Sequence, residues 1–592
     1  MADYVTNRAR LIETFPGMEH LLPAEEPAPL PVHRLTERQR VALLQPAANN
    51  HGSQIIVYGW GDGTIARSLL ADPLCRQKSI LVVVFGGEEG AFARSVTGLE
   101  DTAWSGGNLR ISLIANEADL HRLIISHFNH HEQLPMLAGV EVIDGHPLTP
   151  AAEETRSRLG HRLTTLLSDR PQAYGNDIVD SFMGLDNSAA NAPTLLPAPT
   201  IGEMTGFFGA TPIISIGAGP SLRRHIEALR KLQDRCILVA CDAVLHGLLD
   251  AGIDPHFITP LERVEAILPM LTRAGSSRAI YAGLPVCPRA AIDHFGPDRA
   301  ISLYCGDRLY DWLCPDMGAR INTGLSTGTL SVSVACALGT GSVYLVGHDL
   351  AKDANASHWD GAAYALNDWA KAKDSVDRER PALSGYEDRL IPGNDGGLVA
   401  SIAWWDRFRF DITHEAEAMQ RAGRTLYNVN AHDRIFARID HTGSAPLPDP
   451  DSLPVLAPWR LPARNHERYV AWAARARQLP ADGLAFVKHF EKLREDLAAT
   501  MRQGPSAWQA ETFAERLDLT SAVSTGNRAA FAYMLRSALH NSNADMHLHR
   551  RTESSARSRW IMLQSMDDLS QALIIAMTTL QPELERIARE HS

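Results

Sequence analysis

The sequence lacks features that are typical of membrane, secreted and nucleic-acid-binding proteins. No apolar run approaches the length of a bilayer-spanning helix, and the first residues contain no apolar signal-peptide core. The net charge of −12 disfavours a nucleic-acid backbone as the main partner. Seven scattered cysteines without a CxxC pair disfavour a disulfide framework or a zinc site. We therefore expect a cytoplasmic protein with no membrane span and no nucleic-acid partner.

Two common nucleotide-binding signatures are also incomplete. No GK[ST] sequence is present, which excludes a P-loop ATPase. A dinucleotide fingerprint that began at Gly217 would need a third glycine where the chain has Leu222. No DxD sequence follows a strand near this loop. We therefore expect no obligatory divalent metal and no bound cofactor.

The stretch from Thr211 to Ala243 nevertheless has the pattern of a strand, a glycine-rich loop, a helix and a second strand. The apolar run 213–216 predicts a buried strand. Gly217 and Gly219 then favour a tight loop, and Ser221 is predicted to cap the helix that follows. Such a unit directs backbone N–H groups and a helix N-terminus at an anion. A phosphate-binding loop is therefore predicted, with a simple structural turn as the alternative.

A second glycine-rich sequence follows an apolar run nearer the N-terminus. Gly59, Gly61 and Gly63 form a GxGxG pattern directly after the predicted strand. Short glycine patterns of this kind occur in many turns that bind no ligand. A structural turn is therefore the favoured interpretation, and a second phosphate loop is the alternative.

Polar residues follow other predicted strands of the central region. Asp242, Glu262, His348 and Asp349 each stand at or just after the end of an apolar run, and a Gly/Ser/Thr-rich loop at 323–329 precedes a predicted helix of small residues. Ligands of open α/β sheets bind beyond the carboxyl ends of the strands. We therefore expect these side chains to converge with both loops.

Composition divides the chain into four parts. Residues 1–195 combine a proline-rich arm with an α/β pattern, and residues 196–443 form a central α/β domain. Within the central domain, AISLYCG predicts a strand and RLIPGNDGGLVA predicts an irregular segment. A proline-rich linker follows at 444–465, and residues 466–592 show only helical spacing of apolar residues. The predicted fold class is α/β, with a central Rossmann-like domain between a smaller N-terminal α/β domain and a C-terminal all-α domain.

Three central sequences carry a family resemblance. IISIGAGPSL, LLDAGIDPHFIT and TGLSTGTLSVSVACALGTGSVYLVGHDLA resemble the motility-associated factor (Maf) proteins, bacterial flagellin glycosyltransferases with an MptE-like domain. The first and third sequences also resemble a family of bacterial sialyltransferases, in which a strand ends in GNGPSL. The resemblance covers residues 205–443 and implies a sialyltransferase-like fold for the central domain.

The resemblance implies a glycosyltransferase that uses a CMP-activated sugar as co-substrate. The sugar would be a nonulosonic acid of the pseudaminic or legionaminic type, and the acceptors would be Ser or Thr hydroxyls of flagellin. By motif, the residues implied in donor binding are Gly217, Ala218, Gly219, Pro220, Ser221, Asp242, Thr323, Gly324, Ser326, Thr327 and Gly328. Ala218 stands where the sialyltransferases have an asparagine, so one side-chain contact to the donor is absent.

Metal-free transfer needs a group that accepts the proton of the acceptor hydroxyl. His358 is the first candidate for this base and His348 the second, while Asp349 and Glu262 are alternatives that could take the proton or hold the acceptor. Each histidine also has a purely structural interpretation. Two other functions stay open: a pterin pyrophosphokinase that uses ATP and Mg²⁺, and a non-catalytic flagellin-binding chaperone.

Overall fold

The computed structural model describes residues 178–315, 319–352, 358–363, 388–504, 523–535 and 556–592, and shorter stretches of the first 177 residues. The chain forms two compact units. The first contains Met1–Asp177, Val487–Asp518 and Leu535–Ala576, and the second contains Ile178–Phe486, Leu519–Met534 and Met577–Ser592.

The first unit is built on a parallel sheet with the strand order β3-β2-β1-β4. Its strands are β1 (Gln54–Tyr58), β2 (Ser79–Phe85), β3 (Leu109–Ile114) and β4 (Val140–Asp144). β1 and β2 are buried along their whole length, as expected for inner strands of a parallel sheet. The helices of its N-terminal part include α1 (Tyr4–Thr14), α3 (Thr64–Ala71), α4 (Glu89–Ser95), α5 (Glu117–Leu123) and α6 (Pro150–Thr155).

The second unit contains a parallel sheet of seven strands in the order β13-β12-β9-β5-β6-β7-β8. These strands are β5 (Ile213–Ile216), β6 (Ile237–Cys241), β7 (Phe257–Thr259), β8 (Ile280–Tyr281), β9 (Val343–Val346), β12 (Leu426–Asn428) and β13 (Gly443–Ser444). From β5 the chain adds β6, β7 and β8 on one side and then returns to pair β9 on the other. The boundary between β5 and β9 is therefore the topological switch point, where ligands of such sheets bind.

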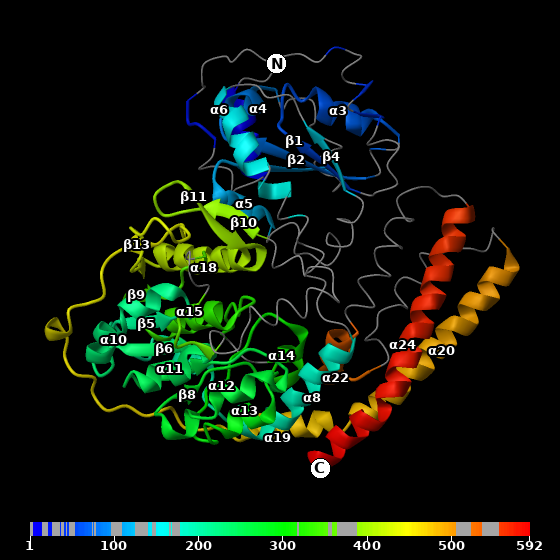
Figure 1. The fold of residues 1–592 in the computed structure, drawn as a ribbon. Coiled ribbons are helices and arrows are strands. Elements are labelled where there is room, and N and C mark those ends of the chain that lie inside the picture. The colour runs from blue at the N-terminus through cyan, green and yellow to red at the C-terminus, as the bar shows by residue number, and fades with distance from the viewer. Residues whose placement is uncertain are drawn as a thin grey trace. The chain divides into compact units, whose positions relative to one another are not determined.

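Helix α15 (Thr327–Leu338) connects the two sides of this sheet and contacts β5, β6 and β7 (Figure 1). Its residues are mostly small, and they include Ser331, Ser333 and Ala335, all of them buried. Small side chains let the helix lie close to the strands. Its N-terminus is consequently held at the carboxyl edge of the sheet, next to the switch point.

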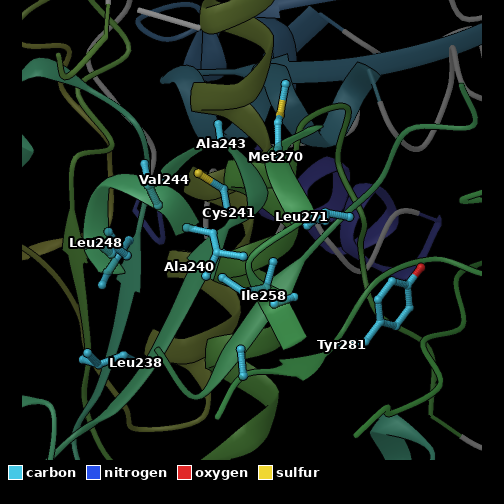
Figure 2. Packing of buried hydrophobic residues seen from close by; sticks show 14 of the residues in the cluster. Leu238, Ala240, Cys241, Ala243, Val244, Leu248, Ile258, Met270, Leu271 and Tyr281 are labelled. Carbon is cyan, nitrogen blue, oxygen red and sulfur yellow. The ribbon is translucent and has the colours of Figure 1, made fainter. Parts of the chain in front are cut away.

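The core beside β6 is apolar and fully buried. Leu238 and Ala240 of β6, Ile258 of β7 and Leu271 of α12 (Leu268–Leu271) belong to one cluster (Figure 2). Burial of side chains of this size contributes about 1.5–3 kcal/mol each. Tyr281 adds a buried hydrogen bond from its hydroxyl to the Leu284 carbonyl at 2.6 Å. This packing fixes the strand ends that position the candidate site.

Two local predictions were wrong. The sequence RLIPGNDGGLVA, expected to be irregular, forms an antiparallel hairpin of β10 (Asp388–Pro392) and β11 (Leu398–Ile402). Its turn depends on Gly396, which has a φ of 85° that favours glycine. The sequence AISLYCG, expected to be a strand, contributes only single bridges at Ala300 and Ser302.

The second unit begins at residue 178. Helix α8 (Ile178–Leu195) belongs to the second unit because two of its asparagines bond to loop carbonyls there. The Nδ2 group of Asn187 donates to the Val286 carbonyl at 2.8 Å, and that of Asn191 donates to the Cys287 carbonyl at 2.7 Å. These side-chain contacts leave no clear sign in the sequence.

The C-terminal helices are divided between the two units. In the second unit, α19 (Glu467–Ala476) and α22 (Thr525–Met534) pack against α14 (Arg308–Leu313). The long helices α20 (Leu479–Gln503) and α24 (Ala556–Glu590) each contribute to both units. None of the helices in the described part of the chain is long and apolar enough to cross a bilayer.

Candidate functional site

The glycine-rich loop after β5 lies directly against the end of β9. The N–H groups of Gly217 and Gly219 donate to the carbonyl oxygens of Val346 and Gly347, each at 2.8 Å. A Cβ atom on Gly217 or Gly219 would lie 2.6 or 2.7 Å from the Gly347 oxygen. Glycine is therefore required because the two backbones touch. These two N–H groups are already used within the protein, which differs from the expected phosphate loop.

The residues after this loop are held by a buried carboxylate. Asp349 accepts hydrogen bonds from the Ser221 N–H at 2.7 Å and from the Ser221 hydroxyl at 2.5 Å, and Asn430 donates to the same hydroxyl oxygen at 2.8 Å. Burial raises the pKa of Asp349 to about 6, against the lowering effect of Ser221. Ser221 therefore does not cap a helix. It lies inside the short 3-10 helix Pro220–Arg224, and α10 (Ile226–Leu232) begins only after it.

A chain of hydrogen bonds fixes the proton position on His348. The Ser331 hydroxyl donates to the Gly328 carbonyl at 2.7 Å, so it accepts from Ser215 at 2.8 Å. The Ser215 oxygen is then left to accept from Nε2–H of His348 at 3.0 Å. All three bonds form together only in this arrangement. The other ring nitrogen, Nδ1, consequently has a free lone pair.

The Nδ1 atom of His348 lies close to a glycine of each of the two loops. Cβ atoms built on Gly217 and Gly328 would lie 3.0 and 3.8 Å from this nitrogen. Burial lowers the pKa of His348 to about 4, so the ring is neutral at pH 7. His348 thus presents a neutral proton acceptor between the glycine-rich loop and α15.

The N-terminus of α15 has a complete capping box. The Ser326 hydroxyl oxygen accepts from the Thr329 N–H at 3.1 Å, and the Thr329 hydroxyl oxygen accepts from the Ser326 N–H at 3.2 Å. The N–H groups of Thr327 and Gly328 have no acceptor among the described residues. Open N–H groups at the start of a helix attract anions.

The rest of the predicted 323–329 loop shapes the approach to this helix. Gly324 has a φ of 58°, and the Thr323 carbonyl accepts from the Thr329 hydroxyl at 3.3 Å. Both residues therefore maintain the loop conformation. The open groups of this loop are the backbone N–H groups at the start of α15.

Asp242 connects the end of β6 to α15. Its carboxylate accepts from the Ala243 N–H at 2.8 Å and bonds to the Thr327 side chain, while the Thr259 hydroxyl donates to the Thr327 carbonyl at 3.0 Å. Burial raises the pKa of Asp242 to about 7, and the charge of Glu262 raises it further. The ends of β6 and β7 are thus attached to the same helix N-terminus.

The remaining candidates lie around this centre. Glu262 is exposed near Asp242, and His358 lies beside Trp405 with a ring separation of 5.9 Å. Burial lowers the pKa of His358. The next residue, Trp359, donates its N–H to the Ala218 carbonyl at 2.8 Å, which places the 358–363 segment against the glycine-rich loop.

Ser215, Ser331 and Asn430, which orient His348 and Ser221, were not among the predicted site residues. Ser215 is the single polar residue in the buried strand IISI, and this contrast is the sequence feature that could have indicated its role. Asn430 lies 209 residues from its partner Ser221, and no local pattern connects them. In the part of the chain that the structure describes, no three His, Cys, Asp or Glu side chains are grouped so that they could hold a metal ion.

The candidate site coincides with a recognised domain. Residues 186–355 match the family described as 6-hydroxymethylpterin diphosphokinase MptE-like. This stretch contains the glycine-rich loop, Asp242, α15 and the end of β9. The match covers strands β5 to β9 of the central sheet and leaves β12, β13 and both ends of the chain outside.

The whole chain is similar in fold to a solved glycosyltransferase structure. That structure is the Maf glycosyltransferase from Magnetospirillum magneticum AMB-1, with a TM-score of 0.54 and 15% sequence identity over 98% of this chain and 96% of the other. No curated protein matches the sequence. At this identity the likeness shows the fold, and the predicted α/β class with a Rossmann-like central domain is confirmed.

Proposed function

We propose that this protein is a glycosyltransferase that transfers a nonulosonic acid, of the pseudaminic or legionaminic type, from its CMP-activated form to Ser or Thr hydroxyls of flagellin. Transfer would take place in the cytoplasm before export. The observation that carries the proposal is the arrangement at the switch point, where open N–H groups of α15 lie beside the neutral acceptor Nδ1 of His348. The fold shared with a Maf glycosyltransferase over nearly the whole chain supports it.

The proposed reaction needs two functions from the protein. The bond between the anomeric carbon of the sugar and a phosphate oxygen of CMP breaks, and its electron pair stays on that oxygen. The N–H groups of Thr327 and Gly328 stabilise the negative charge that develops there. The acceptor hydroxyl forms the new bond to the anomeric carbon, and Nδ1 of His348 takes its proton. This route uses no metal ion.

The geometry favours His348 over His358 as the base. The Ser215–Ser331 chain fixes the tautomer of His348, and its unprotonated Nδ1 lies close to Gly217 and Gly328. In this proposal Asp349 is a positioning residue because both of its oxygens bind Ser221. Glu262 is exposed and would contact the acceptor. His358 would cover the donor from the far side of the glycine-rich loop.

The test is calorimetric titration of CMP, without and with Mg²⁺, into wild-type protein, Thr327→Pro and Thr327→Val. Proline is tolerated at the first position of a helix and removes one N–H, while valine keeps this N–H. Ser326 already has the extended backbone that proline requires before it. We expect metal-independent CMP binding that weakens about tenfold in Thr327→Pro relative to Thr327→Val, the loss of one charge-assisted hydrogen bond.

Three outcomes would contradict the proposal. Binding of ATP that requires Mg²⁺, without CMP binding, would indicate a diphosphokinase. The absence of any nucleotide binding would leave a flagellin-binding chaperone. Equal CMP affinities of Thr327→Pro and Thr327→Val would mean that the donor phosphate does not bind at the N-terminus of α15.

A further inference from the structure

A cavity of about 810 Å³ lies at the amino ends of the central strands. Its walls include Arg235 before β6, His256 before β7 and Ile280 at the start of β8, and residues 455–461 of the linker cover it. The candidate site lies at the carboxyl ends of the same strands. Because the five residues of β6 each rise about 3.3 Å, the two edges are roughly 15 Å apart. The cavity is therefore separate from the candidate site.

The linker is fixed over the cavity without filling it. The Leu456 N–H donates to the Asp234 carbonyl at 2.8 Å, and the Asn465 N–H donates to the Pro197 carbonyl at 2.8 Å. Between these points the Trp459 ring lies nearly parallel to Phe257, with centroids 5.9 Å apart and an interplanar angle of 12°. The segment that the sequence marks as a linker is thus an ordered wall of the cavity.

The cavity is positively charged in an acidic chain. Five basic side chains line it, against two acidic ones: Lys231, Arg235, Arg278, Arg299 and Arg460, against Asp234 and Asp298. Asp234 is paired with Arg278 at 3.1 Å. Arg235 and Arg299 donate to backbone carbonyl oxygens, which leaves their positive charges uncompensated. Lys231 and Arg460 are exposed and have no partner among the described residues.

His256 adds a neutral donor that has no acceptor among the described residues. Its side chain is part of the cavity wall and the residue is only 4% exposed. The Leu238 N–H donates to Nδ1 at 3.1 Å, so the neutral ring carries its proton on Nε2. Its backbone N–H and carbonyl are already paired with Leu238 and Ile280 in the sheet. In the described part of the chain no group accepts from Nε2–H, so this donor is available to a ligand in the cavity.

Part of the cavity lining is apolar. Trp459 and Ile280 offer ring and aliphatic surface, and the cavity has the size of a small-molecule site. We propose that this cavity binds a small organic phosphate, with the phosphate held by Lys231, Arg460 and Nε2–H of His256 and the organic part against Trp459 and Ile280. A phosphate dianion matches the excess positive charge of the cavity lining, and an organic group against Trp459 and Ile280 would fill the remaining volume.

Phenyl phosphate is a suitable probe because it combines both parts. We expect calorimetric titration to show binding to the full-length protein, with no binding of phenol and weaker binding of inorganic phosphate. Arg460→Glu should weaken the binding of phenyl phosphate at least tenfold. Arg502→Glu reverses an equally exposed charge on α20 and should leave the affinity unchanged. Both positions are exposed, so neither variant is expected to disturb folding.

Tryptophan fluorescence provides an independent check of the location. Phenyl phosphate should change the emission of wild-type protein, and Trp459→Phe should remove that change. Thr327→Pro should leave the affinity for phenyl phosphate unchanged, since the cavity lies at the other edge of the sheet. The proposal is overturned if wild-type protein does not bind phenyl phosphate. It is also overturned if Arg460→Glu and Arg502→Glu weaken this binding equally, or if Thr327→Pro abolishes this binding.

Discussion

Two glycine-rich loops follow buried strands of the two parallel sheets, and they use their backbone N–H groups differently. In the first unit, the loop with Gly59, Gly61 and Gly63 is bound by the carboxylate of Glu88. This carboxylate accepts from the N–H groups of Trp60 at 3.2 Å and Phe85 at 2.9 Å. The place where the glycine pattern would hold an anion is thus occupied by the protein's own Glu88 carboxylate. A structural turn remains the favoured interpretation of this loop.

In the second unit, the loop with Gly217 and Gly219 donates to β9 carbonyls, and Asp349 binds only the following Ser221. The open N–H groups are instead at the start of the neighbouring helix α15. In these two loops, a glycine pattern after a strand predicts close backbone contact more reliably than it predicts an anion-binding site. A buried carboxylate and a neighbouring helix decide where an anion can bind.

The largest expected effect is on the transfer rate, and it comes from His348, the proposed base beside the second loop. His348→Gln keeps a hydrogen bond to Ser215 possible but removes the free nitrogen. We expect the rate of sugar transfer to flagellin to fall about 10²–10⁴-fold, with CMP affinity retained, as for the loss of a general base. Mass spectrometry of flagellin incubated with a CMP-activated nonulosonic acid measures this rate.

Glu88→Gln is the matched control in the first loop, and it should keep the wild-type transfer rate. Transfer by His348→Gln at the wild-type rate would remove His348 from the mechanism. A loss in Glu88→Gln equal to that in His348→Gln would mean that the first loop also takes part in the reaction.

The second expected effect is on the pH dependence of stability. Burial raises the pKa of Glu88 from 4.5 to about 7, although backbone N–H groups oppose the shift. Between these pH values the unfolded chain has lost this proton while the folded protein keeps it, so rising pH favours unfolding. The free energy of unfolding of wild type minus that of Glu88→Gln should therefore fall by about 3 kcal/mol from pH 4.5 to 7, and then stay constant.

Urea denaturation at a series of pH values measures this difference. Glu154→Gln changes an exposed carboxylate of the same unit and should show no such trend. A difference that rises with pH would mean that Glu88 is ionised in the folded protein throughout this range, and the assignment of the raised pKa would be wrong.

The smallest expected effect is on stability. It separates two reasons why a position requires glycine, which are close packing and a positive φ. A Cβ on Gly219 would clash with the Gly347 oxygen and the Asp349 carboxylate, whereas a Cβ on Gly61 would have no atom within 4 Å. Gly61 instead has a φ of 64°. Gly219→Ala should cost about 2–3 kcal/mol through overpacking, and Gly61→Ala about 1 kcal/mol through backbone strain. Chemical denaturation gives both values, and a larger cost at Gly61 would contradict this comparison.

Much of the central fold could be predicted because its signals are local. Short apolar runs bounded by glycine or by polar residues marked β5, β6 and β9, and small residues after a hydroxyl-rich loop marked α15. The hairpin β10–β11 was missed because its glycine-rich turn resembles an irregular loop. The helices at the C-terminus were expected, but their division between two units depends on long-range packing.

The sequence by itself determined which residues stand at the carboxyl ends of the central strands, because strand ends and glycine positions are local properties. It placed His348, Asp349, Asp242 and the start of α15 among the candidates. Only the tertiary structure decided their roles. Contacts across more than a hundred residues turn Asp349 toward Ser221 and Nε2 of His348 toward Ser215, and they leave the N–H groups of α15 open. Hydrogen-bond geometry between distant segments has no periodicity or spacing that a sequence can display.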